Sequence, residues 1–187
     1  VEKGITARQI MTEAAFCNAI KLDMAVAGSS NLILHIPAIA NEAGYDLPWW
    51  KRFDEASNEI PLLSNLAPGG PYSLKDLDLA GGMQALLQQL MPRLDGGCLT
   101  VNGCTLAENA ARAVRYNEEV IRSLERPVSQ EPGIGVLTGT LAPEGAILKI
   151  AAVPQELWSF SGKARVYDSL HDGLEALRAG KIQPGDA

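Results

Sequence analysis

Apolar and polar positions in the first part of the chain follow the period of an α-helix. Apolar residues cover most of the circumference of residues 6–27, which is typical of a buried helix, and Gly28 gives the break expected just after a helix end. A second helix is predicted over residues 31–43 with Pro37 inside it, where proline removes one backbone hydrogen bond and bends the axis. A third helix is predicted over residues 48–59.

Two further helix starts are marked by a hydroxyl residue three positions before an acidic one, the pattern of a capping box. Ser73 with Asp76 predicts a short helix that ends at a pair of glycines, and Thr105 with Glu108 predicts a helix to about Arg115. Residues 83–94 between them have an amphipathic helical pattern. The chain is therefore predicted to be mainly helical as far as residue 95.

The pattern changes after residue 95, where short apolar runs separated by turn residues predict β-strands. The predicted strands cover residues 98–101, 134–141, 146–153 and 163–167, and a last helix covers residues 172–179. The fold class is thus expected to be α/β, with a helical part over residues 1–95 and a mixed part over residues 96–187.

Composition narrows the classes of function. The 187 residues carry a formal net charge of −6, whereas a domain that neutralises nucleic-acid phosphates usually has a basic balance. No apolar stretch approaches the roughly 20 residues that span a bilayer, and the first residues lack the basic and apolar regions of a secretory signal. We expect a cytoplasmic protein without a nucleic-acid or membrane partner.

Candidate metal and catalytic residues are sparse. The three cysteines, Cys17, Cys98 and Cys104, have neither disulfide-framework nor zinc-site spacing, which favours packing roles and predicts no metal ligands in this chain. His35 lies on an apolar helix and is interpreted as a hydrogen-bonded core residue. No phosphate loop, HExxH or GxSxG motif occurs.

The most informative segment is residues 27–31, Ala-Gly-Ser-Ser-Asn, which joins two buried helices. Backbone N–H groups at a helix start attract anions, and Ser29, Ser30 and Asn31 add hydroxyl and amide donors. A bound carboxylate or phosphate is one interpretation. The alternative is a capping motif that satisfies only its own helix end.

Several segments together resemble the dihydroxy-acid dehydratase family, which also contains aldonate and phosphogluconate dehydratases. The matching segments keep the order of the family and run along essentially the whole chain: residues 14–20 (AAFCNAI), 27–31 (AGSSN) with His35, 80–82 (AGG), 99–109 (LTVNGCTLAEN), 120–124 (VIRSL) and 135–146 (GVLTGTLAPEGA). Ala27, Ser30, Cys104 and Thr140 depart from the usual family residues, mostly by mild changes.

The resemblance implies a hydro-lyase that removes water from a 2,3-dihydroxy carboxylate and gives a 2-keto acid, with an iron–sulfur cluster as Lewis acid, Mg²⁺ at the carboxylate and a serine alkoxide as base. The family motifs that carry the cluster cysteines, the magnesium ligands and the catalytic serine have no counterpart here. The chain is therefore interpreted as an internal fragment without catalytic or metal-binding residues of its own. It would span the end of an N-terminal α/β domain (residues 1–95) and the start of a swivelling β-barrel domain (residues 96–187).

The hypotheses on function remain open in two respects. A sugar-acid dehydratase, acting on an aldonate such as arabinonate, xylonate or gluconate, is the alternative within the class. A non-catalytic structural or oligomerisation module is the alternative outside it. The resemblance implies a small dihydroxy acid as ligand and a homo-oligomer, and only Ser29, Ser30 and Asn31 are predicted to face the substrate. A segment cut from two domains is also expected to expose apolar faces and to dissolve poorly.

Overall fold

The computed structural model describes residues 3–187, which form two compact units. The first extends to Ala152 and the second covers Val153–Ala187. The regular structure is helical apart from one small antiparallel sheet, so the chain combines helices and strands as an α/β class requires. The predicted division at residue 95 concerns the domains of the family, and it stays a prediction.

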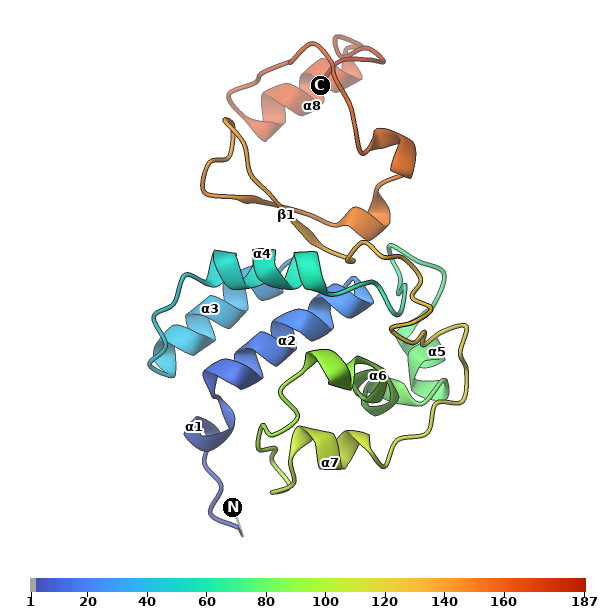
Figure 1. Ribbon diagram of the computed structural model, residues 1–187. Helices are drawn as coiled ribbons and strands as arrows, with labels where there is room; N and C mark the ends of the chain where they lie inside the picture. Colours follow the sequence, from blue (N-terminus) through green and yellow to red (C-terminus); the bar gives the residue numbers. More distant parts are fainter. Residues whose placement is uncertain (1–2) are drawn as a thin grey trace. The chain divides into compact units, whose positions relative to one another are not determined.

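The first unit is built around helix α2 (Glu13–Val26), which contacts α3 (Leu32–Glu42), α4 (Trp49–Glu59) and α6 (Gly82–Leu90) (Figure 1). The predicted helix over residues 6–27 is wrong at one point, because α1 (Ala7–Ile10) ends before α2 begins. The hydroxyl of Thr12 accepts the N–H of Ala15 and starts a new helix.

The other helical predictions hold in type, and they fail mainly in length. Helix α3 contains the predicted proline, and α5 (Leu74–Leu79) starts at the predicted capping box of Ser73. Helix α6 passes into a 3₁₀ turn, η1 (Met91–Arg93). Helix α7 (Leu106–Ala110) also starts at its capping box, but it ends five residues early.

Tertiary hydrogen bonds explain the early end of α7. The carbonyl of Ala113 accepts the side-chain amide of Gln88 at 3.2 Å, and the N–H of Tyr116 donates to the carbonyl of Ala80 at 2.8 Å. These backbone groups of residues 113–116 therefore bind residues of α6 and of the segment before it instead of continuing α7.

The strands are shorter than predicted. β1 (Gly135–Leu137) pairs antiparallel with β2 (Ala146–Leu148), with Val136 opposite Ile147. The chain then enters a 3₁₀ turn, η2 (Ile150–Ala152), which ends the second predicted strand early. The strands predicted at residues 98–101 and 163–167 are wrong: each has only an isolated bridge, Leu99 with Thr105 and Lys163 with Asp186.

The hydrophobic core lies between α2, α4 and α6 and extends to the segments after α7. Its largest fully buried apolar residues include Phe53, Ile20, Met24, Leu63, Leu86, Leu90, Ile121 and Ile134. Phe16 packs edge-on against Trp49, with ring centroids 5.8 Å apart, and both Trp49 and Phe53 are buried in this core. Trp50, in contrast, is 47% exposed.

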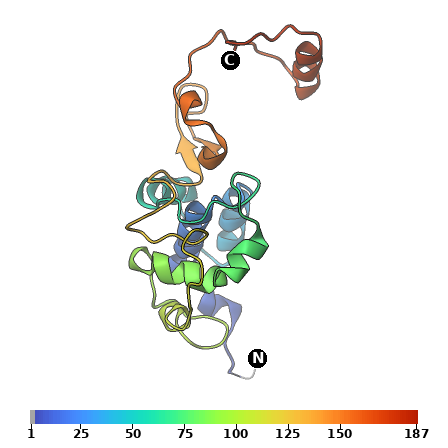
Figure 2. The same cartoon turned by 90° about the vertical axis from the view of Figure 1, so that its right-hand side faces the viewer.

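The second unit contains the 3₁₀ turn η3 (Gln155–Leu157) and helix α8 (Leu170–Arg178). Helix α8 starts two residues before its predicted start, because the hydroxyl of Ser169 accepts the N–H of Asp172 and caps it. Outside α8 this unit is drawn mostly as loop, in dark orange to red (Figure 2). Among residues 3–187, none of the helices combines the length and the apolar composition that a membrane span requires.

Candidate functional site

The segment that joins α2 to α3 is fixed by an unusual helix end. Ala27 adopts the left-handed conformation (φ 49°, ψ 48°), a place that glycine usually takes. The N–H of Gly28 donates to the carbonyl of Asp23 at 3.0 Å, which closes the last turn of α2. The chain thus leaves α2 in a single, defined direction.

Carbonyl groups at the end of α2 have no partner within the helix, and other segments supply their partners. The N–H of Gly133 donates to Met24 O at 2.9 Å, and the N–H groups of Leu63 and Ser64 donate to Ala25 O at 2.8 and 3.1 Å. A Cβ on Gly133 would overlap the backbone of Ala27, so only glycine permits this close approach. The base of the loop is therefore held by two segments distant in sequence.

The three residues predicted to face the substrate lie together on this loop, and all are exposed. The hydroxyl of Ser29 accepts the N–H of Asn31 at 3.3 Å, which is a short turn rather than a helix cap. Asn31 stands at the cap position of α3, but its side chain makes no capping hydrogen bond. The backbone N–H groups of residues 32–34 donate to the carbonyls of residues 29–31 at 3.0–3.2 Å. The loop therefore closes the first turn of α3 with its own backbone, and its polar side chains remain exposed.

A pocket of about 430 Å³ lies beside the loop. The loop contributes Ala27, Gly28, Ser29 and Ser30 to it, and Asn31 is not part of its wall. The remaining wall combines apolar residues of other segments with one cation: Val26, Leu66, Ala67, Pro68, Leu74, Met83 and Lys149. The pocket therefore joins an apolar wall to a wall of hydroxyl groups and one ammonium.

Lys149 and Asp23 provide the charges around the loop. The Lys149 ammonium donates a hydrogen bond to Gly28 O at 3.1 Å. Asp23 is only 8% exposed, and its Oδ2 is buried without a hydrogen-bond partner. Burial raises the pKa of Asp23 to about 6, and the Ser29 N–H and the charge of Lys149 oppose this rise. A Cβ on Gly28 would overlap the carboxylate of Asp23, which therefore lies directly against the loop.

Sequence reasoning found the loop and missed these two residues. Asp23 had one available signal, because a carboxylate in the last turn of a helix meets the negative end of the helix dipole and needs a reason to be there. Lys149 had none, since it lies 121 positions from Gly28. The interpretation of His35 as a core residue is wrong, because its side chain is exposed.

The cysteines do not fit a metal centre within the described part of the chain. Among residues 3–187, no group of three or more histidine, cysteine, aspartate and glutamate side chains is placed to hold a metal ion. Burial raises the pKa values of the Cys17 and Cys98 thiols, which disfavours the thiolate that binds iron or zinc. The side-chain amide of Asn18 instead donates a hydrogen bond to Cys98 Sγ at 3.4 Å, so this sulfur packs against a neighbouring side chain.

Comparison with known proteins places the chain. Residues 1–109 match the family model described as dihydroxy-acid/6-phosphogluconate dehydratase N-terminal, and residues 119–187 match its C-terminal counterpart. The chain belongs to this dehydratase family. The resemblance found in the sequence motifs is thereby confirmed.

Curated members of the family are similar along the whole chain. A dihydroxy-acid dehydratase of Methanosarcina barkeri (strain Fusaro) is 45% identical over 190 residues that cover 100% of this chain and 34% of the relative. Proteins of the same name are 46% identical in Caldanaerobacter subterraneus subsp. tengcongensis, with 100% and 34% covered, and 44% identical in Ignicoccus hospitalis, with 99% and 34% covered. The chain spans about a third of the length of these dehydratases.

The residues of the loop and its pocket come from both family matches. The loop lies in the N-terminal match, whereas Lys149 lies in the C-terminal match. Residues of the two family matches therefore meet at this pocket, within the first compact unit.

Proposed function

We propose that this chain is a segment of a dihydroxy-acid dehydratase, a hydro-lyase that removes water from a 2,3-dihydroxy carboxylate and gives a 2-keto acid. The observation that carries the proposal is the 44–46% identity to proteins of that name over essentially all of the chain. The sugar-acid alternative has no comparable support among these relatives. The purely structural alternative is not favoured either, because family membership extends over both parts of the chain.

Within this enzyme, Ser29, Ser30 and Asn31 are proposed to contact the substrate. Hydroxyl and amide groups donate and accept hydrogen bonds, which suits a ligand that carries both hydroxyl groups and a carboxylate. The support is the exposure of all three side chains and the pocket beside Ser29 and Ser30.

The iron–sulfur cluster, Mg²⁺ and catalytic serine of the family are proposed to be held by segments other than this one. The raised thiol pKa values of Cys17 and Cys98 support this proposal. No catalytic residue is assigned within the chain. This segment would shape the substrate site and bind the substrate, and the β-barrel domain would begin in its second half. The whole enzyme would be a cytoplasmic homo-oligomer that acts on a small molecule.

The test is turnover by the full-length enzyme, reconstituted anaerobically with iron, sulfide and Mg²⁺, with 2,3-dihydroxyisovalerate and a C5 aldonate as substrates. We expect keto-acid formation from the first substrate and at least about 100-fold lower kcat/KM for the aldonate, since a site built for one hydrogen-bonding pattern rejects another strongly. Preferred turnover of the aldonate would contradict the proposal. It would favour the sugar-acid alternative.

The contribution of the loop is tested in the same enzyme with Asn31→Ala. We expect kcat/KM to fall by about 10-fold to 100-fold, the loss of one or two substrate hydrogen bonds. The matched control is Asn41→Ala, which removes the same group from an exposed position at the other end of α3. Equal activity of the two variants would remove Asn31 from the substrate site.

A further inference from the structure

The backbone segment that carries Lys149 is held in place by hydrogen bonds to other segments. Lys149 follows β2 directly and precedes η2. The N–H of Ala151 donates to Gly133 O at 3.3 Å, and Gly133 N–H donates to Met24 O at 2.9 Å. This chain of hydrogen bonds sets the segment that carries Lys149 against the end of α2.

The Lys149 side chain crosses from that segment to the loop. Its stem passes close to Gly69, where an added Cβ would lie 3.5 Å from Lys149 Cε. Its ammonium ends at the carbonyl of Gly28, 3.1 Å away, and the side chain is half-buried. The contact fixes the peptide group that directly precedes Ser29.

The charges near Lys149 explain why its ammonium donates to the carbonyl of Gly28. Within residues 3–187, no carboxylate lies at ion-pair distance from this ammonium. The Asp23 carboxylate, which is buried against the same loop, is close enough to interact with it electrostatically. One N–H of Lys149 binds Gly28, and the ammonium has three donors in total.

We propose that Lys149 is a positioning residue of the dehydratase: it holds the Gly28 carbonyl and thereby sets Ser29, Ser30 and Asn31 for the substrate. The inference rests on the proposed function of the loop. It adds a residue from the C-terminal family match to a site whose other polar residues come from the N-terminal match. The role is indirect, because Lys149 acts through the backbone of the loop.

The experiment compares full-length Lys149→Met and Lys149→Arg with the control Lys75→Met, which removes an exposed lysine of α5. Methionine keeps the apolar stem and removes the charged donor, whereas arginine keeps a charged donor. We expect Lys149→Met to lower kcat/KM by about 10-fold to 100-fold, mainly through KM, because misplaced binding groups weaken substrate positioning. Lys149→Arg should recover at least about a third of this loss, with the loss expressed as the change in the logarithm of kcat/KM.

A double-mutant cycle with Asn31→Ala separates positioning from general stability. If Lys149 acts through the loop, Lys149→Met should reduce kcat/KM less in the Asn31→Ala background than in the wild type. Independent, multiplying losses would overturn the inference, and so would a Lys149→Met enzyme that behaves like Lys75→Met. If Lys149→Met fails to fold, the same cycle with Lys149→Arg decides the question. Absence of turnover by the wild type would instead contradict the proposed function itself.

Discussion

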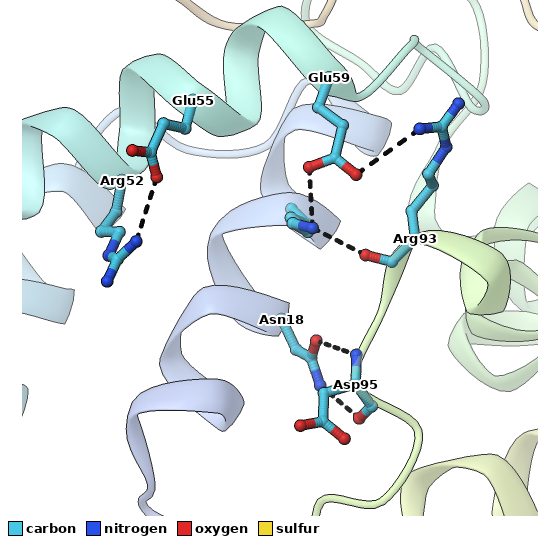
Figure 3. Close-up of polar contacts among 7 residues, drawn as sticks. Asn18, Arg52, Glu55, Glu59, Arg93 and Asp95 are labelled. Carbon is cyan, nitrogen blue, oxygen red and sulfur yellow. Dashed lines mark hydrogen bonds and ion pairs between the residues drawn. The ribbon is translucent and has the colours of Figure 1, made fainter.

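The side chain of Asn18 and the backbone of Asp95 form a reciprocal pair of hydrogen bonds, each 2.9 Å long (Figure 3). Asn18 Nδ2 donates to Asp95 O, and Asp95 N donates to Asn18 Oδ1. Asn18 lies on α2 and is only 7% exposed. The Asn18 side-chain amide thus hydrogen-bonds both backbone groups of Asp95, as a neighbouring β-strand would. It uses both its donor and its acceptor to do so.

Replacing Asn18 by Ala should destabilise the full-length protein by about 2–3 kcal/mol, because it leaves two backbone groups of a half-buried segment without partners. The measurement is the free energy of unfolding in urea. Asn41→Ala, at an exposed helix position, is the control and should change this free energy by less than about 0.5 kcal/mol. Equal stability of the two variants would show that water replaces the Asn18 amide without cost.

Gly133→Ala should destabilise the protein by about 3 kcal/mol or more, because the new methyl group would overlap the backbone of Ala27 and force two segments apart. Gly139→Ala is the matched control, since nothing lies within 4 Å of the corresponding Cβ position. Thermal unfolding of both variants checks the prediction. A Gly133→Ala protein as stable as the control would mean that the loop relaxes freely, which would also weaken the case for a fixed substrate site.

Asp23→Asn should stabilise the folded protein at alkaline pH. Burial raises the pKa of Asp23 from 3.8 to about 6 in the folded protein, against the opposing effects of the Ser29 N–H and Lys149. The folded state therefore holds this proton more tightly than the unfolded state, and stability falls as the pH rises from about 4 to above 6. The full loss above that window is about 3 kcal/mol, and an uncharged asparagine does not incur it.

The measurement for Asp23→Asn is the free energy of unfolding of variant and wild type at pH 4 and pH 8. The advantage of the variant should be larger at pH 8 by up to about 3 kcal/mol. Asp46→Asn, at an exposed position, controls for the loss of one negative charge. A pH-independent difference would show that Asp23 is ionised at the same pH in both states.

The helices could be predicted from the sequence because their signals are local. The hydroxyl caps at Ser73 and Thr105 and the apolar periodicity of α3 and α4 act within a few residues. The early ends of α7 and β2 could not be predicted in the same way. Backbone groups beyond these ends bind distant partners, as Ala113 O accepts from Gln88 and Ala151 N–H donates to Gly133 O, and no local pattern records such a partner.

The candidate site shows the same division. Ser29, Ser30 and Asn31 are adjacent in sequence and form a recognisable loop. Lys149 reaches that loop only because a two-stranded hairpin and the glycine at 133 bring a distant segment to the end of α2. The family motifs contain only one end of this contact, because Gly28 lies in the matching segment 27–31, whereas Lys149 follows the segment 135–146.

The ion pairs that Glu59 forms with Lys21 and Arg93 should contribute much less to stability than the hydrogen bonds of Asn18. Lys21 Nζ lies 2.8 Å from Glu59 Oε2 and donates to Arg93 O at 2.9 Å, and Arg93 lies 3.7 Å from the other Glu59 oxygen (Figure 3). The Glu59 side chain is 35% exposed, so water and salt screen its attraction to both cations. Glu59→Gln should therefore cost about 0.5–1 kcal/mol in dilute buffer, and the loss should shrink further in 1 M NaCl. Urea unfolding at the two salt concentrations tests this, with Asn18→Ala as the reference. A salt-independent loss as large as that of Asn18→Ala would contradict the prediction, because it would mean that the ion pairs of Glu59 stabilise this contact as strongly as the Asn18 amide.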